Sequence, residues 1–287
     1  MRRRLPDALI ETAEFGQAVA IGDARVSFHP AGHILGSAQV RVEVGGEIWV
    51  VSGDYKRQPD PTCAPFDVVP CHTFITEATF ALPIYTWDPT TAVIDEIVEW
   101  WRTNSAQRRP SVIFCYVLGK AQRILAELLP RLTEADGPIH LHGAMVALTE
   151  AYRASGIRLA PAERITDTMR GAALARSLVL APLSARGTPW MRRLPNASIA
   201  FASGLMRVRG VRRQRAFDRG FVLSDHADWP SLLSTVAETG ASRVFVTHGW
   251  SDAFARYLRE TRGLDTGTLR TAFEGEAGEL TAPEEPE

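Results

Sequence analysis

The sequence has 287 residues, of which 45% are hydrophobic and 23% charged, and its net charge is −1 at pH 7. This composition is ordinary for a globular chain with a substantial core, and it excludes a protein whose overall charge alone would select nucleic acid. The sequence contains no run of about 18 apolar residues, which a transmembrane helix would require. No apolar segment typical of a signal peptide follows the basic N-terminus. Three sparse cysteines without a CxxC pair suit a reducing compartment. We therefore expect a cytoplasmic protein without a membrane partner, whose cysteines serve packing.

The first predicted elements are β-strands. Apolar runs that alternate with polar residues predict strands over residues 19–28, 38–44, 47–51 and 73–77. The pair Gly45-Gly46 between the second and third runs is typical of a hairpin turn. The fourth run, TFITE, ends in Glu77.

Helices and strands alternate in the rest of the chain. Asp88 followed by Pro89 is typical of an N-cap and a first helical residue, and predicts a helix through AVIDEIVEWW. Gly119 precedes a second helical pattern, KAQRILAELLPRL. Further helices are predicted over residues 144–154, 229–239 and 252–262, and further strands over 111–117, 139–143, 177–182, 198–203, 220–224 and 243–247. This alternation implies an α/β fold.

Five residues that can bind metal follow apolar runs directly or lie in the turn after one. They are His33, Asp54, Glu77, His226 and His248. Carboxylate oxygens and imidazole nitrogens are suitable ligands for zinc. Each residue taken alone also has a structural explanation, as a hydrogen-bonding group at a strand end, a turn residue or half of an ion pair. Either neighbouring acid of His226, Asp225 or Asp228, could simply cap the following helix.

Basic residues concentrate in one segment. The stretch RVRGVRRQRAFDR, residues 207–219, holds six arginines and one aspartate. It is either a solvated loop or a patch that contacts phosphate, which arginine binds with a planar fork. Lys120 of GKAQ falls in the first turn of a predicted helix, where it either contacts phosphate or only starts the helix. The pair His140 and His142 could chelate a metal, but we interpret it, like His29 and His72, as structural or in contact with substrate.

The ordered motifs PAGHILGSA, SGDYK, TEATF, YVLGKAQ, SDHAD and VTHGW resemble the metallo-β-lactamase-fold nucleases of the β-CASP group. Within that group the chain is most similar to the bacterial ligase-associated DNA exonucleases, which are also described as relatives of mRNA 3′-end processing factors. The resemblance covers roughly residues 15–273. It implies an α/β fold in which a metallo-β-lactamase αββα sandwich carries an inserted β-CASP domain. The implied segments are 1–82 for the N-terminal part of the sandwich, 83–219 for the insert, 220–273 for the C-terminal return and 274–287 for an acidic, disordered tail.

The same resemblance implies roles for single residues. His33, Asp54 and His248 would be metal ligands, with Asp54 bridging two Zn²⁺ ions, for which Mn²⁺ could substitute. Asp54 would thereby be catalytic, together with Glu77 and His226, which would protonate the departing oxygen. The residues expected to contact nucleic acid are Lys120, Arg207, Arg209, Arg212, Arg213 and Arg215.

One family motif has no counterpart in the sequence. The motif His-x-His-x-Asp-His, which provides most ligands of both metals in the family, is not found in residues 1–32. We therefore expect a chain that lacks an N-terminal segment of the fold, or else a non-catalytic relative, and in both cases poor metal binding and weak activity.

The leading functional prediction is a zinc-dependent DNA exonuclease that acts beside a DNA ligase in repair. The alternatives are an RNA-processing nuclease, a small-molecule metallohydrolase of the same fold and a nucleic-acid-binding protein without catalytic activity.

Overall fold

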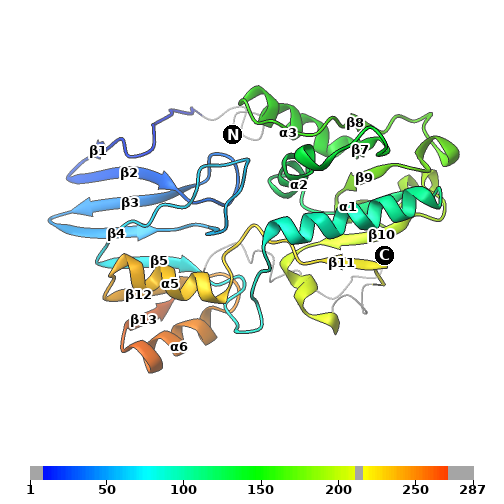
Figure 1. Ribbon diagram of the computed structural model, residues 1–287. Helices are drawn as coiled ribbons and strands as arrows, with labels where there is room; N and C mark the ends of the chain where they lie inside the picture. Colours follow the sequence, from blue (N-terminus) through cyan, green and yellow to red (C-terminus); the bar gives the residue numbers. More distant parts are fainter. Residues whose placement is uncertain (1–8, 211–215, 271–287) are drawn as a thin grey trace.

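Two β-sheets lie next to each other in the molecule (Figure 1). The computed structural model describes residues 9–210 and 216–270. One sheet has seven strands and the other has six. This mixed α/β architecture with two sheets agrees with the predicted fold class.

The seven-stranded sheet is formed by two separate parts of the chain, in the order β1-β2-β3-β4-β5-β12-β13. Strands β1 to β4 pair antiparallel, whereas β4, β5, β12 and β13 are parallel. The strands are β1 (Val19–Ile21), β2 (Ala24–Pro30), β3 (Ala38–Val44), β4 (Glu47–Val51), β5 (Thr73–Glu77), β12 (Arg243–Thr247) and β13 (Asp265–Thr268). Because β5 and β12 are paired in parallel, Glu77 lies opposite Thr247 and their following loops emerge together.

Helices α5 (Trp229–Thr239) and α6 (Ser251–Arg262) cover one face of this sheet. Leu232 and Phe254 of the two helices pack against Phe74 and Val244 of the strands, and all four side chains are fully buried. Burying one such side chain contributes about 2 kcal/mol to the free energy of unfolding. The start of α5 is fixed by Asp228, whose carboxylate accepts a hydrogen bond from the Ser231 amide at 3.0 Å.

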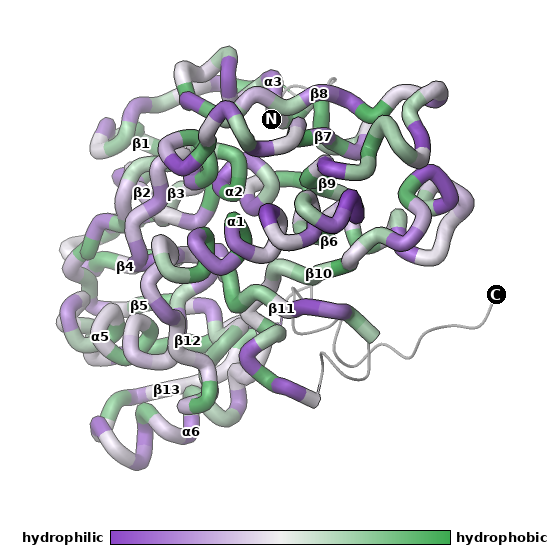
Figure 2. The backbone as a smooth tube through the Cα atoms, turned by 45° about the vertical axis from the view of Figure 1, so that its right-hand side comes forward, coloured by the Kyte–Doolittle hydropathy of each residue, from purple (hydrophilic) through white to green (hydrophobic). Residues whose placement is uncertain are grey.

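The six-stranded sheet is parallel throughout, in the order β11-β10-β6-β9-β7-β8. Its strands are β6 (Ser111–Phe114), β7 (Ile139–Leu141), β8 (Glu163–Arg164), β9 (Leu178–Ala181), β10 (Ser198–Ala202) and β11 (Arg219–Phe221). Its helices are α1 (Thr90–Ala106), α2 (Lys120–Leu128) and α3 (Gly143–Ala154). Strands β6 and β9 are buried at every position, which explains their uninterrupted apolar runs. Hydrophobic residues gather along the interior strands, and hydrophilic ones mark the outer bends (Figure 2).

Several predicted boundaries are wrong. The run over residues 19–28 is two strands, because Gly22 takes a positive φ of 59° and turns the chain between β1 and β2. Pro89, not Asp88, is the N-cap of α1. The strand predicted over 220–224 is β11, which begins at Arg219, ends at Phe221 and pairs with β10.

The second face of the seven-stranded sheet carries a row of apolar side chains. Cross-strand partners Val40, Val51, Ile75 and Phe245 lie side by side on it, and Val51 remains 37% exposed. An αββα sandwich would need a sheet packed on this face, whereas the other described sheet lies beside it (Figure 1). The sandwich therefore stays a prediction, as do the domain boundaries.

The predicted acidic tail, 274–287, lies outside the described residues. None of the described helices combines the length and the apolar character that crossing a membrane requires.

Candidate metal centre

The site is built from loops that follow strand ends on neighbouring elements. His33 lies in the turn after β2, Asp54 in the loop after β4, Glu77 at the end of β5 and His248 directly after β12. His226 lies in the segment between β11 and α5. The turn of His33 is held by the Ser37 hydroxyl, which accepts hydrogen bonds from the amides of His33 at 3.1 Å and Ile34 at 3.2 Å.

Asp54 lies at the centre of the site. Its Oδ2 is 3.9 Å from Nε2 of His33, and its Oδ1 is 3.8 Å from Nδ1 of His248. His33 donates its Nδ1 proton to the main-chain oxygen of Asp225 at 2.8 Å, because a carbonyl can only accept. This hydrogen bond fixes the tautomer of His33 and turns Nε2 toward Asp54. Its geometry is that of a histidine ligand oriented by a carbonyl behind it.

His226 and Glu77 form a buried pair. Nδ1 of His226 lies 3.1 Å and 3.0 Å from the two carboxylate oxygens of Glu77. Burial alone would raise the pKa of the Glu77 carboxyl, but the charge and hydrogen bond of His226, with hydrogen bonds from Thr79 and the Tyr55 amide, lower this pKa. The indole of Trp87 also donates to the main-chain oxygen of His226 at 2.9 Å. Glu77 is thus an ionised partner that orients the imidazole.

Backbone strain marks the end of β12. His248 has a positive φ of 59°, which is unusual for a residue that is not glycine. Such conformations cost roughly 1–2 kcal/mol and persist where the surrounding structure enforces them, often at functional sites. The following residue, Gly249, also has a positive φ, of 61°, and a Cβ there would overlap the main chain of Ala78.

This crowding predicts a large stability difference between two glycines. Gly249→Ala should lower the free energy of unfolding by at least about 2 kcal/mol more than Gly240→Ala, because overlap with main-chain atoms adds to the strain of positive φ. Gly240 also has a positive φ, of 67°, but an added Cβ would have nothing within 4 Å. Urea unfolding of the two variants measures this difference. Equal losses would mean that the end of β12 can move away from Ala78.

The donor set fits one divalent metal ion. One ligand atom from each of His33, Asp54 and His226 lies within 4.8 Å of the others. Three protein ligands of imidazole and carboxylate type are the usual set of a catalytic zinc site. His248, at the other carboxylate oxygen of Asp54, is the further nitrogen nearby. The structure thus brings both predicted histidine ligands, His33 and His248, next to Asp54, and it also places His226, the predicted acid, beside His33 and Asp54.

The predicted contacts to nucleic acid are only partly supported by position. Lys120 is completely buried and forms an ion pair with Asp225 at 3.5 Å, so its assignment to direct contact with nucleic acid is corrected. Arg207 is half-buried and pairs with Asp88 at 3.1 Å, whereas Arg209 is exposed. The other predicted residues, Arg212, Arg213 and Arg215, lie outside the described residues.

The remaining histidines take structural positions. His142 caps α3 by accepting a hydrogen bond from the Ala144 amide at 3.1 Å, and His140 is buried on β7. His72 accepts from the Ile48 amide at 2.9 Å. His29 lies 3.5 Å from Asp67. None of these four belongs to a group of metal-binding side chains among the described residues.

Sequence reasoning missed a group of buried charges behind the site. Five side chains, each at most 5% exposed, form this buried charge cluster: Lys56, Asp60, Lys120, Arg123 and Asp225. The available signal was weak. Lys120 and Arg123 are three residues apart on α2 and Lys56 and Asp60 four residues apart in a loop, spacings that equally suit exposed pairs.

Several known proteins are similar in sequence to this chain. The chain is 34% identical over 288 residues to a probable DNA ligase of Opitutus terrae, an alignment that covers 99% of this chain and 27% of that protein. It is 27% identical over 118 residues to the endoribonuclease YSH1 of Eremothecium gossypii, covering 40% of this chain and 15% of that protein. The chain thus spans about a quarter or less of the length of these relatives. No family model matches the sequence.

A solved structure has a similar fold. A protein of unknown function from Enterococcus faecalis V583 superposes with a TM-score of 0.55 at 11% identity, covering 83% of this chain and 61% of that one. The likeness supports the mixed α/β fold and carries no information on activity.

Proposed function

The chain is related to the metallo-β-lactamase-fold nucleases of the β-CASP group, and on this premise we propose that it is the phosphodiester-cleaving part of a metal-dependent DNA exonuclease that acts with a DNA ligase. The observation that carries the proposal is the meeting of His33, Asp54 and His226 within ligand distance of one another. The relative matched over almost the whole chain is named a probable DNA ligase, which supports DNA as the substrate and a ligase as the partner.

We propose that one divalent ion, Zn²⁺ or Mn²⁺, is held by Asp54 together with surrounding histidines. A metal there would neutralise the negative charge that develops on the phosphate during cleavage. The ligands in this proposal are His33, Asp54 and His248, and His226 lies beside His33 and Asp54 as the proton donor. A second zinc ion would need more ligands than the described residues bring together.

His226 has a role in proton transfer in this proposal. Glu77 holds the imidazole on its Nδ1 side at 3.0 Å, which orients the ring for proton transfer. An imidazolium in this position can protonate the oxygen that leaves as the phosphodiester bond breaks.

Replacing His226 separates this role from that of a ligand. His226→Ala should slow cleavage by about 10²- to 10⁴-fold, the usual contribution of a general acid, while the zinc content per chain stays unchanged. Zinc content is measured by elemental mass spectrometry after gel filtration, and cleavage with an end-labelled oligonucleotide. A variant that loses its zinc would make His226 a ligand and would remove the acid role from the proposal.

The arginine segment predicts a dependence of DNA binding on salt. Arg209→Gln should reduce the slope of log binding constant against log salt concentration by about 1, because one released counterion accompanies each phosphate contact. Arg207→Gln is the matched comparison. It should change the slope less, because Asp88 already partly neutralises that guanidinium. Identical slopes for wild type and both variants would exclude these two arginines from the contact with DNA.

An RNA-processing nuclease is the second candidate, supported by the alignment with an endoribonuclease over 118 residues. Single-stranded DNA and RNA of the same sequence, each labelled at one end, distinguish the two in the presence of Zn²⁺ or Mn²⁺. Faster release of single nucleotides from DNA supports the proposal. Cleavage of RNA alone, or internal cuts, would replace it, and removal of the metal by a chelator should stop either reaction.

A further inference from the structure

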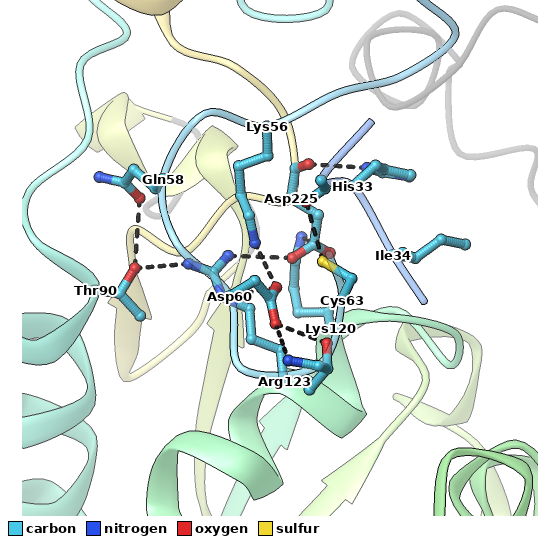
Figure 3. A network of polar contacts seen from close by, with 12 residues as sticks. His33, Ile34, Lys56, Gln58, Asp60, Cys63, Thr90, Lys120, Arg123 and Asp225 are labelled. Carbon is cyan, nitrogen blue, oxygen red and sulfur yellow. Dashed lines mark hydrogen bonds and ion pairs between the residues drawn. The ribbon is translucent and has the colours of Figure 1, made fainter. Parts of the chain in front are cut away.

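The buried charge cluster lies directly behind the candidate metal centre. In Figure 3, Lys56, Lys120 and Arg123 point toward the carboxylates of Asp60 and Asp225. Lys120 and Arg123 come from α2, which belongs to the six-stranded sheet, whereas Lys56 and Asp60 follow β4 of the seven-stranded sheet. The cluster thus joins the two halves of the molecule where their loops meet.

Arg123 contacts three segments of the chain at once. Its Nη1 donates to the main-chain oxygen of Ser224 at 2.6 Å and lies 3.3 Å from Oδ1 of Asp225. Its Nη2 donates to the Thr90 hydroxyl, at the start of α1, at 2.6 Å. Its Nε lies 3.5 Å from Oδ2 of Asp60. With 1% of its surface exposed, the guanidinium has almost no contact with solvent.

These contacts fix the main chain that carries His226 and that orients the candidate ligand His33. Asp225 immediately precedes His226, and its main-chain oxygen is the acceptor for Nδ1 of His33 at 2.8 Å. Arg123 holds the main-chain oxygen of Ser224 and the carboxylate of Asp225. It thereby determines where the main-chain oxygen of Asp225 points. The same carboxylate also receives Lys120 from α2 at 3.5 Å.

The loop that carries Asp54 is tied to the same cluster. Lys56, two residues after Asp54, forms an ion pair with Asp60, and the Lys56 amide donates to the Ala31 oxygen at 3.1 Å. The Cys63 thiol donates to the Gly32 oxygen at 3.3 Å, next to His33. The loops that carry His33, Asp54 and His226 are therefore all tied to one group of buried charges.

We propose that Arg123 is a positioning residue of the metal centre, which sets the orientation of His33 and His226 through Ser224 and Asp225. The proposal rests on the metal site of the proposed function and extends it to a residue that does not touch the ion. The branched, planar guanidinium is needed because four differently placed oxygens are contacted at once, which the single ammonium group of lysine cannot do.

The test compares Arg123→Lys with Arg102→Lys. Arg102 also contacts a carboxylate through two nitrogens, at 2.7 and 2.8 Å from Asp136, and among the described residues its contacts lie away from the loops of the candidate metal centre. We expect Arg123→Lys to weaken Zn²⁺ binding by about 10- to 100-fold in a chelator competition, the usual cost of altering a group behind a ligand. In the metal-free protein, the ¹⁵N signal of His33 Nδ1 should shift. Arg102→Lys should leave both measurements unchanged.

A purely structural role for Arg123 gives a different result. In that case Arg123→Lys would lower the unfolding midpoint, but the folded variant would keep the wild-type Zn²⁺ affinity and the wild-type His33 signal. This result would overturn the proposal. If Arg123→Lys fails to fold, Thr90→Val, which removes only the outer acceptor of the guanidinium, decides. A loss of affinity of a few-fold with a shifted His33 signal supports the proposal, and unchanged values refute it.

The outcome is separable from that of the proposed function. If wild-type protein binds no Zn²⁺, the metal centre itself is refuted. The His33 signal of the metal-free variants then still decides whether Arg123 orients that imidazole.

Discussion

Replacing Asp54 by asparagine is expected to abolish both metal binding and cleavage. Asp54 approaches two histidines of the site, through separate carboxylate oxygens at 3.9 Å and 3.8 Å. An amide is a poor metal ligand beside a carboxylate, and changes to groups behind a ligand already cost 10–100-fold in affinity. We therefore expect Asp54→Asn to weaken Zn²⁺ binding by more than about 100-fold, measured by chelator competition, and cleavage of end-labelled DNA to fall to background.

A second aspartate that lies near a histidine provides the control. Asp67 is 3.5 Å from His29, outside the candidate centre, and its side chain is 58% exposed. Asp67→Asn should keep wild-type affinity and cleavage. An Asp54→Asn variant that binds Zn²⁺ as tightly as the wild type would show that Asp54 is not a ligand.

Removing the charge of Asp225 is expected to be the most destabilising single change in the buried charge cluster. Its carboxylate lies within 3.5 Å of Lys120 and Arg123, and both cations are buried. Breaking a buried pair leaves an uncompensated charge and costs about 3–5 kcal/mol. Asp225→Asn should therefore lower the free energy of unfolding by about that amount in urea at pH 7, with a chelator present to exclude metal effects.

An exposed pair provides the comparison. Asp95 lies 2.6 Å from Arg131, but its side chain is 67% exposed. Asp95→Asn should change the free energy of unfolding by less than about 1 kcal/mol, because water screens exposed pairs. Equal effects of the two substitutions would mean that water reaches the cluster.

The pH dependence of stability has the same origin. Burial opposes ionisation of Asp225, but Lys120, Arg123, Lys56 and His33 lower the pKa of its carboxyl well below the ordinary value of 3.8. The unfolded chain thus binds this proton at higher pH than the folded one, so the stabilisation is complete above pH about 5 and is lost as the pH falls toward the folded pKa. Between pH 5 and 2, the free energy of unfolding should fall less steeply in Asp225→Asn than in the wild type.

Elements with strong local signals were predicted well from the sequence. The helix over residues 229–239 agrees with α5 at both ends, because Asp228 caps its start and Gly240, with φ of 67°, ends it. The strand over 243–247 agrees with β12. Strand β13 was missed, because DTGT has no apolar run and forms a strand only through its pairing with β12.

The candidate site was predictable as a set of residues, but not as a geometry. The motif order indicated His33, Asp54, Glu77, His226 and His248, and the structure brings them to one place. The position of His226 beside His33 and Asp54 depends on how the segment after β11 packs, which no local pattern encodes. The burial of Lys120 was likewise unpredictable, because its partner in space, Asp225, is distant in sequence.

The metal content of the wild-type chain tests the central claim most directly. The protein is stripped with a chelator, reloaded with Zn²⁺, passed through gel filtration and measured by elemental mass spectrometry beside the Asp54→Asn variant. The structure predicts about one Zn²⁺ per wild-type chain and almost none in the variant. A folded wild-type chain that retains no Zn²⁺, or a variant that retains as much as the wild type, would contradict a metal centre at Asp54.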